Sequence, residues 1–246
     1  MRQLYFLFPI FSYLVALASQ VWFILYLTDL DFLNNIYAPQ KTSTLLALII
    51  DFTLLSIFAL QHSIMARDSF KKALTKLIPA PIERAFYTLL SGVAFILICY
   101  FYQPIDGLVW SIEDGFWKKT IWILFAFGWA LSFYATFIID HFELFGLKQP
   151  YYNIKNQKLK KTNFKERSLY KFIRHPIQLG VLIALWATPK MSFGHLFLST
   201  ILTIYIFVGL YFEEKALVNE FGDVYENYKK RVGMLFPKIK AEYETK

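Results

Sequence analysis

Four stretches of this chain are long and apolar enough to cross a lipid bilayer, and they constrain the fold more than any other feature of the sequence. A membrane-crossing helix needs about 20 mostly apolar residues. The stretches are Leu4–Leu27, Thr44–His62, Ala85–Tyr102 and Lys118–Ile139. Only 18% of the 246 residues are charged and 57% are hydrophobic, whereas a soluble domain has about 25% charged residues. We therefore predict an all-α fold, a polytopic membrane protein with lipid around most of its surface.

A fifth apolar region lies between His175 and Glu213 and is broken once, at Ala187-Thr188-Pro189. A proline inside a helix interrupts it. We therefore predict a helical hairpin with arms of roughly Ile177–Ala187 and Leu196–Phe212. The first arm is too short to cross a bilayer of about 30 Å. Because a hairpin returns the chain to the side it left, the residues that flank it are expected to meet at one membrane face.

Basic residues are unequally divided between the two sides of this topology. If the N-terminus is cytoplasmic, 22 of the 26 Lys and Arg residues fall in cytoplasmic segments, and four fall outside: Lys41, Lys118, Lys119 and Lys190. Cytoplasmic loops carry the excess of Lys and Arg in membrane proteins, so we expect both termini and both ends of the hairpin in the cytoplasm. The net charge of +8 is then expected to face membrane lipids, and no nucleic-acid partner is expected.

The whole chain, 1–246, is expected to form a single membrane domain. Residues 1–139 would supply four transmembrane helices, and residues 140–246 would supply the hairpin of 176–212 and a tail helix. In the tail, apolar residues recur from Leu217 to Val232 at three- and four-residue spacing, which is typical of an amphipathic helix. We interpret this helix as lying on the cytoplasmic membrane surface, and no obligate protein partner is indicated.

Two polar pairs flank the hairpin, Arg174-His175 at its start and Glu213-Glu214 at its end. Arg binds carboxylate or phosphate through paired hydrogen bonds, and His titrates near neutral pH. Charges at an apolar boundary are costly unless they pair or bind something, so we interpret these residues as a site for a charged ligand. The alternative is an interfacial anchor in which Pro176 only begins a helix and the acids only begin a solvated one.

Other polar residues in or beside the spans leave two interpretations open. Asp51 lies inside a span and is either functional or hydrogen-bonded to a neighbouring helix. His62 follows it on the same helix face, about 16 Å away. Asp140-His141-Phe142-Glu143 and Gly146–Gln149 are either a polar helix end with a glycine stop or part of the cytoplasmic site. His195 is expected to be structural.

Several kinds of site find no support in the sequence. The single cysteine, Cys99, excludes an intramolecular disulfide and a cysteine-cluster metal site. The metal-binding spacings CxxC and HExxH are absent, so no metal site is predicted. No stretch alternates strand and helix, and GxGxxG is absent, which argues against a soluble Rossmann-type cofactor domain.

A set of motifs covers the last third of the chain: Arg174-His175-Pro176-x-x-x-Gly180, Glu213-Glu214, and Phe221-Gly222…Tyr225…Tyr228…Pro237. As a set they resemble the C-terminal cofactor module of integral-membrane S-adenosylmethionine-dependent methyltransferases. Isoprenylcysteine carboxyl methyltransferases and phospholipid methyltransferases belong to this superfamily. Gln178 is a departure, because the family often has Tyr at this position.

Motifs upstream and in the hairpin narrow this resemblance. They are Ala59–Arg67, Glu83-Arg84, His141–Gln149 and Trp186–His195. They look like the NnrU-related branch and, more closely, like the bacterial methanethiol S-methyltransferases, over nearly the whole chain.

The resemblance implies an S-methyltransferase of the bacterial inner membrane that converts methanethiol, a small thiol, to dimethyl sulfide in a pocket open to the cytoplasm. Its cofactor would be S-adenosyl-L-methionine, with Arg174 on the methionine carboxylate and a Glu on the amino group or ribose. The implied cofactor-binding residues are Arg174, His175, Pro176, Gly180, Glu213 and Glu214. The alternatives are a prenylated, lipid or quinone-like substrate, or a non-enzymatic NnrU-like membrane protein or transporter.

This chemistry suits a pocket surrounded by lipid. Methyl transfer from a sulfonium to a thiolate cancels two opposite charges, so low polarity disfavours the separated ions more than the transition state. The thiol must first lose its proton, since a free Cys-like thiol has a pKa of about 8.5. The candidate catalytic bases are His62, His141 and Glu214, and no spacing in the sequence chooses among them.

Overall fold

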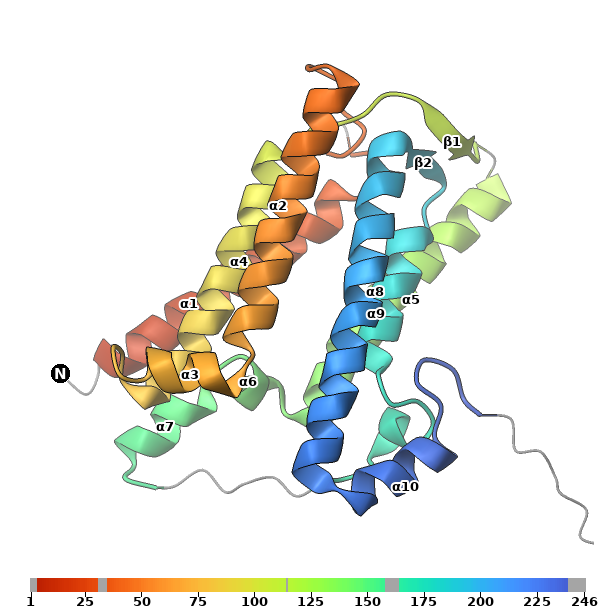
Figure 1. Ribbon diagram of the computed structural model, residues 1–246. Helices are drawn as coiled ribbons and strands as arrows, with labels where there is room; N and C mark the ends of the chain where they lie inside the picture. Colours follow the sequence, from red (N-terminus) through yellow and green to blue (C-terminus); the bar gives the residue numbers. More distant parts are fainter. Residues whose placement is uncertain (1–3, 31–34, 114, 158–163, 239–246) are drawn as a thin grey trace, which may run out of the picture.

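The structure is a computed structural model that describes residues 4–30, 35–113, 115–157 and 164–238, most of them helical (Figure 1). The end of the predicted C-terminal module, residues 239–246, lies outside these ranges, and so do some of the basic residues counted above. The basic residues outside them are Arg2, Lys158, Lys160, Lys161, Lys240 and Lys246.

Five helices in the described ranges are long and apolar enough to cross a membrane. They are α1 (Leu4–Tyr26), α2 (Thr44–Met65), α4 (Glu83–Phe101), α5 (Gly115–Ile139) and α9 (Phe193–Phe221). The first four match the predicted spans to within a few residues, and the protein is therefore an integral membrane protein, as predicted. The fifth, α9, contains the second hairpin arm within a single helix of 29 residues.

The shorter elements connect these helices and cover their ends. They are α3 (Asp68–Leu74), η1 (Ala80–Ile82), β1 (Leu108–Ser111), α6 (His141–Leu144), α7 (Lys148–Ile154), η2 (Ser168–Lys171), α8 (Pro176–Trp186), β2 (Lys190–Ser192) and α10 (Asp223–Arg231). Helix α8 is the predicted first arm of the hairpin. Its 11 residues span about 16 Å, which is too short to cross a bilayer.

The predicted tail helix is divided, which corrects the expected boundary. Helix α9 continues past Phe212 to Phe221, and Gly222 then turns the chain at φ +56°. Only after this turn does α10 begin, with Tyr225 and Tyr228 on its buried face. The apolar spacing in the sequence is helical on both sides of Gly222, so spacing alone did not reveal the break.

A two-stranded antiparallel sheet departs from the all-α prediction. Strand β1 precedes α5 and pairs with β2 in the hairpin turn. Strands of four and three residues are too short to show an alternating pattern. Nearby, the Tyr102 hydroxyl donates to the Gly194 carbonyl at 2.8 Å, so the turn is fixed to the end of α4.

His195 is buried in this turn, and both of its ring nitrogens have partners. Nδ1 lies 2.7 Å from the Tyr37 hydroxyl, and Nε2 lies 3.2 Å from the Leu185 carbonyl oxygen. A fully buried imidazole with two satisfied nitrogens supports the turn. The structural role predicted for His195 agrees with these contacts.

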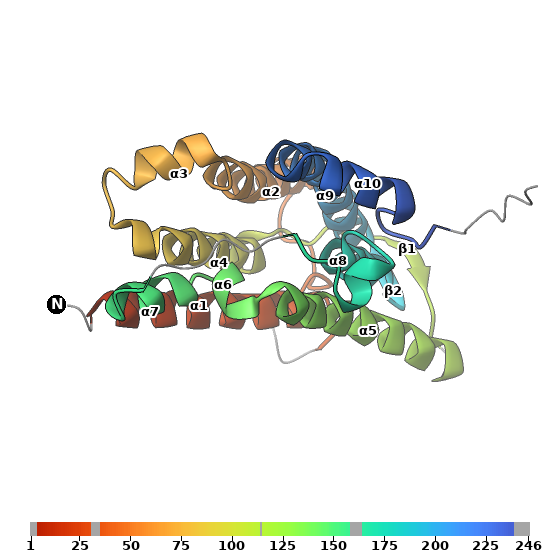
Figure 2. The same ribbon diagram turned by 90° about the horizontal axis from the view of Figure 1, so that it is seen from below.

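The five long helices and the shorter α8 form two groups of three. Seen from below in Figure 2, α4 lies between α1 and α2, and α8 lies between α5 and α9. One hydrophobic core contains residues of both groups: Phe23, Leu55, Phe58, Ile98, Phe125, Leu185, Leu198 and Leu202. The groups also meet where Ser63 on α2 donates to the Tyr205 hydroxyl on α9 at 3.3 Å. This contact places the inner part of α9 beside the last turns of α2.

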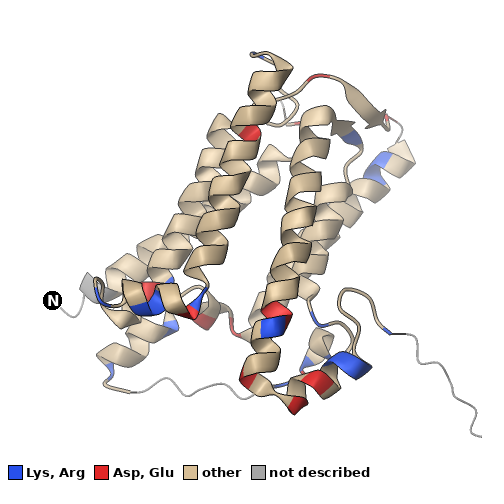
Figure 3. Cartoon of the chain, viewed as in Figure 1, with Lys and Arg blue, Asp and Glu red and all other residues tan. Residues whose placement is uncertain are grey.

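Charged residues gather at the end of the molecule that carries α3, α6, α7 and α10, and few lie elsewhere (Figure 3). Asp51 is an exception, because it is fully buried within α2. Its Oδ1 accepts the backbone N–H of Gln103, just after α4, at 2.7 Å. Asp51 is therefore hydrogen-bonded, as in the second interpretation above, but its partner is a loop and not a helix.

Candidate functional site

The hairpin brings its two flanking polar pairs into contact. Arg174 donates from Nε to Glu214 Oε1 at 2.6 Å, and His175 Nε2 lies 3.0 Å from the same oxygen. His175 Nδ1 lies 3.9 Å from Glu213 Oε2. The side chains of Arg174 and Glu214 are only 8% and 13% exposed, so each compensates the other's buried charge. The proximity expected for these four residues is confirmed, and we call them the polar cluster.

The segment that carries the cluster's basic residues is held by the chain after α10. The Arg174 N–H donates to the Gly233 carbonyl at 2.9 Å, and the His175 N–H donates to the Met234 carbonyl at 3.1 Å. These bonds fix the backbone immediately before Pro176 starts α8. Residues beyond the tail helix thus anchor the backbone of the polar cluster, which the sequence did not predict.

The Arg174 guanidinium is immobilised by two backbone carbonyls in addition to Glu214. Its Nη1 donates to the carbonyls of Val232 at 2.5 Å and Lys229 at 3.2 Å, while its Nε holds Glu214. Its second amino group, Nη2, makes no hydrogen bond to any residue that the structure describes. A fixed guanidinium with one free amino group is well suited to an anion.

Glu213 is the more open acid of the cluster. Its side chain is 48% exposed, and Gln178 donates from Nε2 to its Oε2 at 3.3 Å. Gln178, the departure from the family pattern, therefore faces the cluster. The Tyr170 hydroxyl is buried without a partner among the described residues. Burial raises the pKa of the Tyr170 phenol, and the negative charge of Glu213 raises it further.

Pro176 and Gly180 have structural tasks in the fold. Pro176 is the first residue of α8, where its fixed φ favours the helix start. A Cβ on Gly180 would lie 2.4 Å from the Gly128 carbonyl oxygen and 2.6 Å from the Ser132 nitrogen. Small residues allow helices to approach this closely, so Gly180 joins α8 to α5. A cofactor contact at these two positions stays a prediction.

His141 lies apart from the polar cluster in all of its described contacts. Its Nε2 lies 2.9 Å from the Tyr13 hydroxyl, and its Nδ1 lies 2.7 Å from Thr136 Oγ1. The ring stacks on Phe137 at a centroid distance of 4.2 Å. Burial lowers the pKa of His141, while Asp140 acts in the opposite direction. Both nitrogens are occupied, so His141 joins α1 to α5 and α6.

The rest of the His141 motif connects α6 to the start of α4. Arg84 Nε donates to the Leu144 carbonyl at 2.9 Å, and Gly146 ends the turn at φ +82°. Lys148 forms an ion pair with Asp140. These contacts agree with the first interpretation, a polar helix end with a glycine stop.

His62 is half-buried near the end of α2 and faces α4. The Tyr87 hydroxyl lies 2.8 Å from its Nε2, and Ser91 Oγ lies 3.2 Å from its Nδ1. Glu213 is close enough to Tyr87 to interact with it electrostatically. The contacts of His62 are thus with Tyr87 and Ser91 of α4, which the sequence did not single out.

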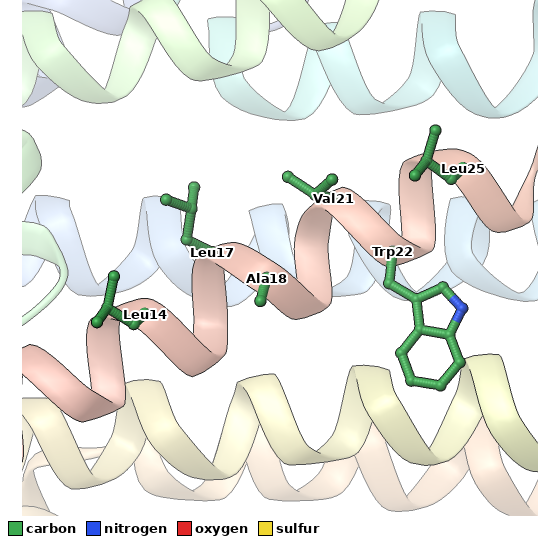
Figure 4. A pocket seen from close by; sticks show the side chains of 6 residues that line it. All are labelled: Leu14, Leu17, Ala18, Val21, Trp22 and Leu25. Atoms are coloured by element: carbon green, nitrogen blue, oxygen red, sulfur yellow. The ribbon is translucent and has the colours of Figure 1, made fainter.

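A shallow apolar groove of about 570 Å³ lies on α1. Its lining residues all come from that helix (Figure 4): Leu14, Leu17, Ala18, Val21, Trp22 and Leu25. They recur every three or four residues along a span, and none has a charged or catalytic group. This face is suited to lipid contact and is separate from the polar cluster.

Comparison with known proteins identifies relatives of this chain. A family model described as NnrU protein matches residues 52–213. The chain is 47% identical to a methanethiol S-methyltransferase of Pseudomonas deceptionensis, over 79% of this chain and 74% of that protein. It is 41% identical to methanethiol S-methyltransferase 1 of Bradyrhizobium diazoefficiens, over 94% of this chain and 81% of that protein. It is 28% identical to nurim of Bos taurus, over 69% of this chain and 67% of that protein.

No solved structure matches the chain, so its family rests on sequence. The family match includes His62, His141 and three residues of the polar cluster, Arg174, His175 and Glu213, and it ends just before Glu214. The identity to the bacterial relatives extends over most of the chain. By these matches the chain belongs to the NnrU protein family.

Proposed function

We propose that this protein is an integral-membrane S-methyltransferase that transfers a methyl group from S-adenosyl-L-methionine to methanethiol and so forms dimethyl sulfide. Relatives that are 47% and 41% identical to it over the aligned residues carry the name methanethiol S-methyltransferase. The observation that carries the proposal is the polar cluster, a fixed Arg174 beside two acids at the end of the hairpin. The methyl donor named here goes beyond the relatives' names.

The residues present fit a donor that carries a carboxylate, an amino group and a ribose. Arg174 offers a free amino group for the carboxylate, and the half-exposed Glu213 offers an acceptor for an ammonium or a hydroxyl. The buried Tyr170 hydroxyl beside them has no partner in the described ranges. An unsatisfied buried hydroxyl next to an acid is an expected feature of a ligand site. Glu214 would hold Arg174 and His175 in place.

The proposed arrangement puts the polar cluster at the cytoplasmic face of a bacterial inner membrane. In this arrangement α1, α2, α4 and α5 cross the bilayer, α8 and α9 form the hairpin, and α10 lies on the cytoplasmic surface. The charged end of the molecule (Figure 3) would then face the cytoplasm, in agreement with the distribution of Lys and Arg. Both termini would be cytoplasmic.

Among the three candidate bases, His62 is the best placed. Glu214 already accepts hydrogen bonds from Arg174 and His175, and the described contacts of His141, with Tyr13 and Thr136, lie away from the polar cluster. Tyr205, which bonds to the residue next to His62, lies eight residues before Glu213, or about 12 Å along α9. A donor anchored at the cluster would thus direct its methyl group inward, toward His62.

The proposed activity predicts a defined product from purified protein. The full chain in lipid vesicles, given methanethiol and S-adenosyl-L-methionine, is expected to release dimethyl sulfide and one S-adenosylhomocysteine for each turnover. Headspace gas chromatography and liquid chromatography measure the two products. Vesicles with the Arg174→Met, Glu214→Leu protein are the control, because this variant keeps the hydrophobic fold without the proposed anion site.

Other results of this experiment would contradict the proposal. Methylation of a prenylated, lipid or quinone-like acceptor without dimethyl sulfide would assign the protein to a different substrate. Absence of methyl transfer to every acceptor, with well-folded protein, would favour a non-enzymatic function or a transporter.

The structural assignment of His141 gives a separate prediction. We expect His141→Gln to lower the melting temperature, because buried hydrogen bonds to Tyr13 and Thr136 are disturbed at a cost of about 1–3 kcal/mol. Its kcat per folded molecule is expected to stay within about threefold of wild type. Thermal unfolding in detergent and the dimethyl sulfide assay measure the two effects. A large fall in kcat with an unchanged melting temperature would instead make His141 the base.

A further inference from the structure

Two hydroxyl groups on α4 hold the His62 ring. Tyr87 and Ser91 are four residues apart and therefore share one face of the helix. The Tyr87 hydroxyl lies 2.8 Å from Nε2 and 2.9 Å from Nδ1, and Ser91 Oγ lies 3.2 Å from Nδ1. The Phe58 ring packs against the imidazole at a centroid distance of 5.4 Å. The position of the ring is thus fixed from both α2 and α4.

The contacts of Ser91 decide which ring nitrogen carries the hydrogen. A serine hydroxyl has a single hydrogen. Besides His62 Nδ1 at 3.2 Å, two acceptors lie within its reach: the Tyr87 carbonyl, which is the nearest at 3.0 Å, and Gln61 Oε1 at 3.4 Å. With its hydrogen on either of them, Ser91 Oγ can only accept from His62. Nδ1 is then the protonated nitrogen, and Nε2 keeps a lone pair toward which Tyr87 donates.

We propose that Tyr87 and Ser91 are positioning residues that hold His62 as the neutral Nδ1–H tautomer, with Nε2 ready to accept the proton of the methyl acceptor. The inference rests on the proposed function. It adds to that function the residues that select the tautomer and the orientation of the base. When the thiol takes the place at Nε2, the Tyr87 oxygen, 2.9 Å from Nδ1, can accept from the Nδ1–H and so keep its contact with the ring.

The proposed step is balanced in atoms and charge. The S–H bond of methanethiol breaks, and its proton moves to His62 Nε2. The thiolate sulfur forms a bond to the methyl carbon, and the bond from that carbon to the donor sulfonium breaks with its electron pair left on the donor sulfur. The products are two neutral thioethers and a protonated His62, which releases the proton through Tyr87 toward the open end of the site.

The test measures pH profiles of Tyr87→Phe and Ser91→Ala in the full chain in vesicles. The charged and titratable groups around His62 that bear on the profile are Arg84 and Tyr87 on α4 and Tyr205 and Glu213 on α9. At about pH 7 each variant is expected to lose about tenfold in kcat, the effect of one hydrogen bond. The KM for the methyl donor is expected to be unchanged, because neither residue belongs to the polar cluster.

The defect is expected to shrink as the pH approaches the thiol pKa of about 8.5, where free thiolate no longer needs a base. Ser91→Thr keeps the hydroxyl and is expected to restore most of the kcat. Tyr100→Phe is the matched control, since Tyr100 lies on the same helix and is 65% exposed. It is expected to behave as wild type at every pH.

Four outcomes separate the possible failures. Wild-type kcat in both variants, or a defect of the same size at every pH, would overturn the inference. A fall in melting temperature that accounts for the lost activity, without rescue by threonine, would also overturn it, because the pair would then be purely structural. If wild-type protein forms no dimethyl sulfide, the proposed function itself fails.

Discussion

Replacing Glu214 with alanine is expected to destabilise the protein by about 3–5 kcal/mol and to weaken binding of S-adenosylhomocysteine by about ten- to a hundredfold. The reason is that Arg174, only 8% exposed, would lose the carboxylate that it contacts at 2.6 Å. A buried cation without its partner keeps its full desolvation cost. Its guanidinium would also lose the contact that fixes its direction. Thermal unfolding in detergent and titration calorimetry measure the two losses.

A double variant separates the loss of folding from the loss of binding. Arg174→Met with Glu214→Leu leaves neither charge of the pair, so the melting temperature is expected to recover most of the loss. Binding is expected to stay weak, because the anion site is gone. Glu226→Ala is the control acid, since the side chain of Glu226 on α10 is 45% exposed and its one ion pair among the described residues is with Lys229, at 3.9 Å. If Glu214→Ala matches this control in stability and affinity, the cluster is not the cofactor site.

The membrane helices and the position of the polar cluster were predictable because both follow from local chemistry. Lipid requires long apolar helices, so the ends of α1, α2, α4 and α5 can be read from hydropathy. A proline break makes a hairpin, and a hairpin brings its ends together. The contact between Arg174 and Glu214, forty residues apart, follows from that one inference.

Contacts between distant segments were the part that the sequence did not reveal. The backbone of Arg174 is held by Gly233, and His62 is held by Tyr87 and Ser91 on another helix. Tyrosine and serine are common in membrane helices, and only packing shows which of them faces a histidine. For the same reason, spacing did not separate His62 from His141 as the base.

Gly180 has a packing role in the structure beside the ligand role that the family resemblance predicts. The resemblance assigns it to the cofactor, whereas its contacts are with α5, where an added Cβ would meet two backbone atoms at 2.4 and 2.6 Å. We expect Gly180→Ala to lower the melting temperature by several degrees, because backbone atoms cannot move aside and overpacking costs about 1–3 kcal/mol. Gly128→Ala is expected to have a similar effect, since its Cβ would lie 2.6 Å from the Gly180 carbonyl oxygen.

Gly209→Ala is the matched control for this last prediction, because Gly209 lies in α9 and has no atom within 4 Å of an added Cβ. Alanine favours a helix over glycine by up to about 1 kcal/mol, so Gly209→Ala is expected to keep or raise the melting temperature. The order of the three variants in thermal unfolding therefore tests close helix packing directly. If Gly180→Ala keeps the melting temperature of wild type but loses S-adenosylhomocysteine binding, the glycine serves the ligand and the packing interpretation is wrong. If both properties fall together and Gly128→Ala shows the same pair of losses, the approach of α8 to α5 is what holds Arg174 and His175 at the mouth of the site.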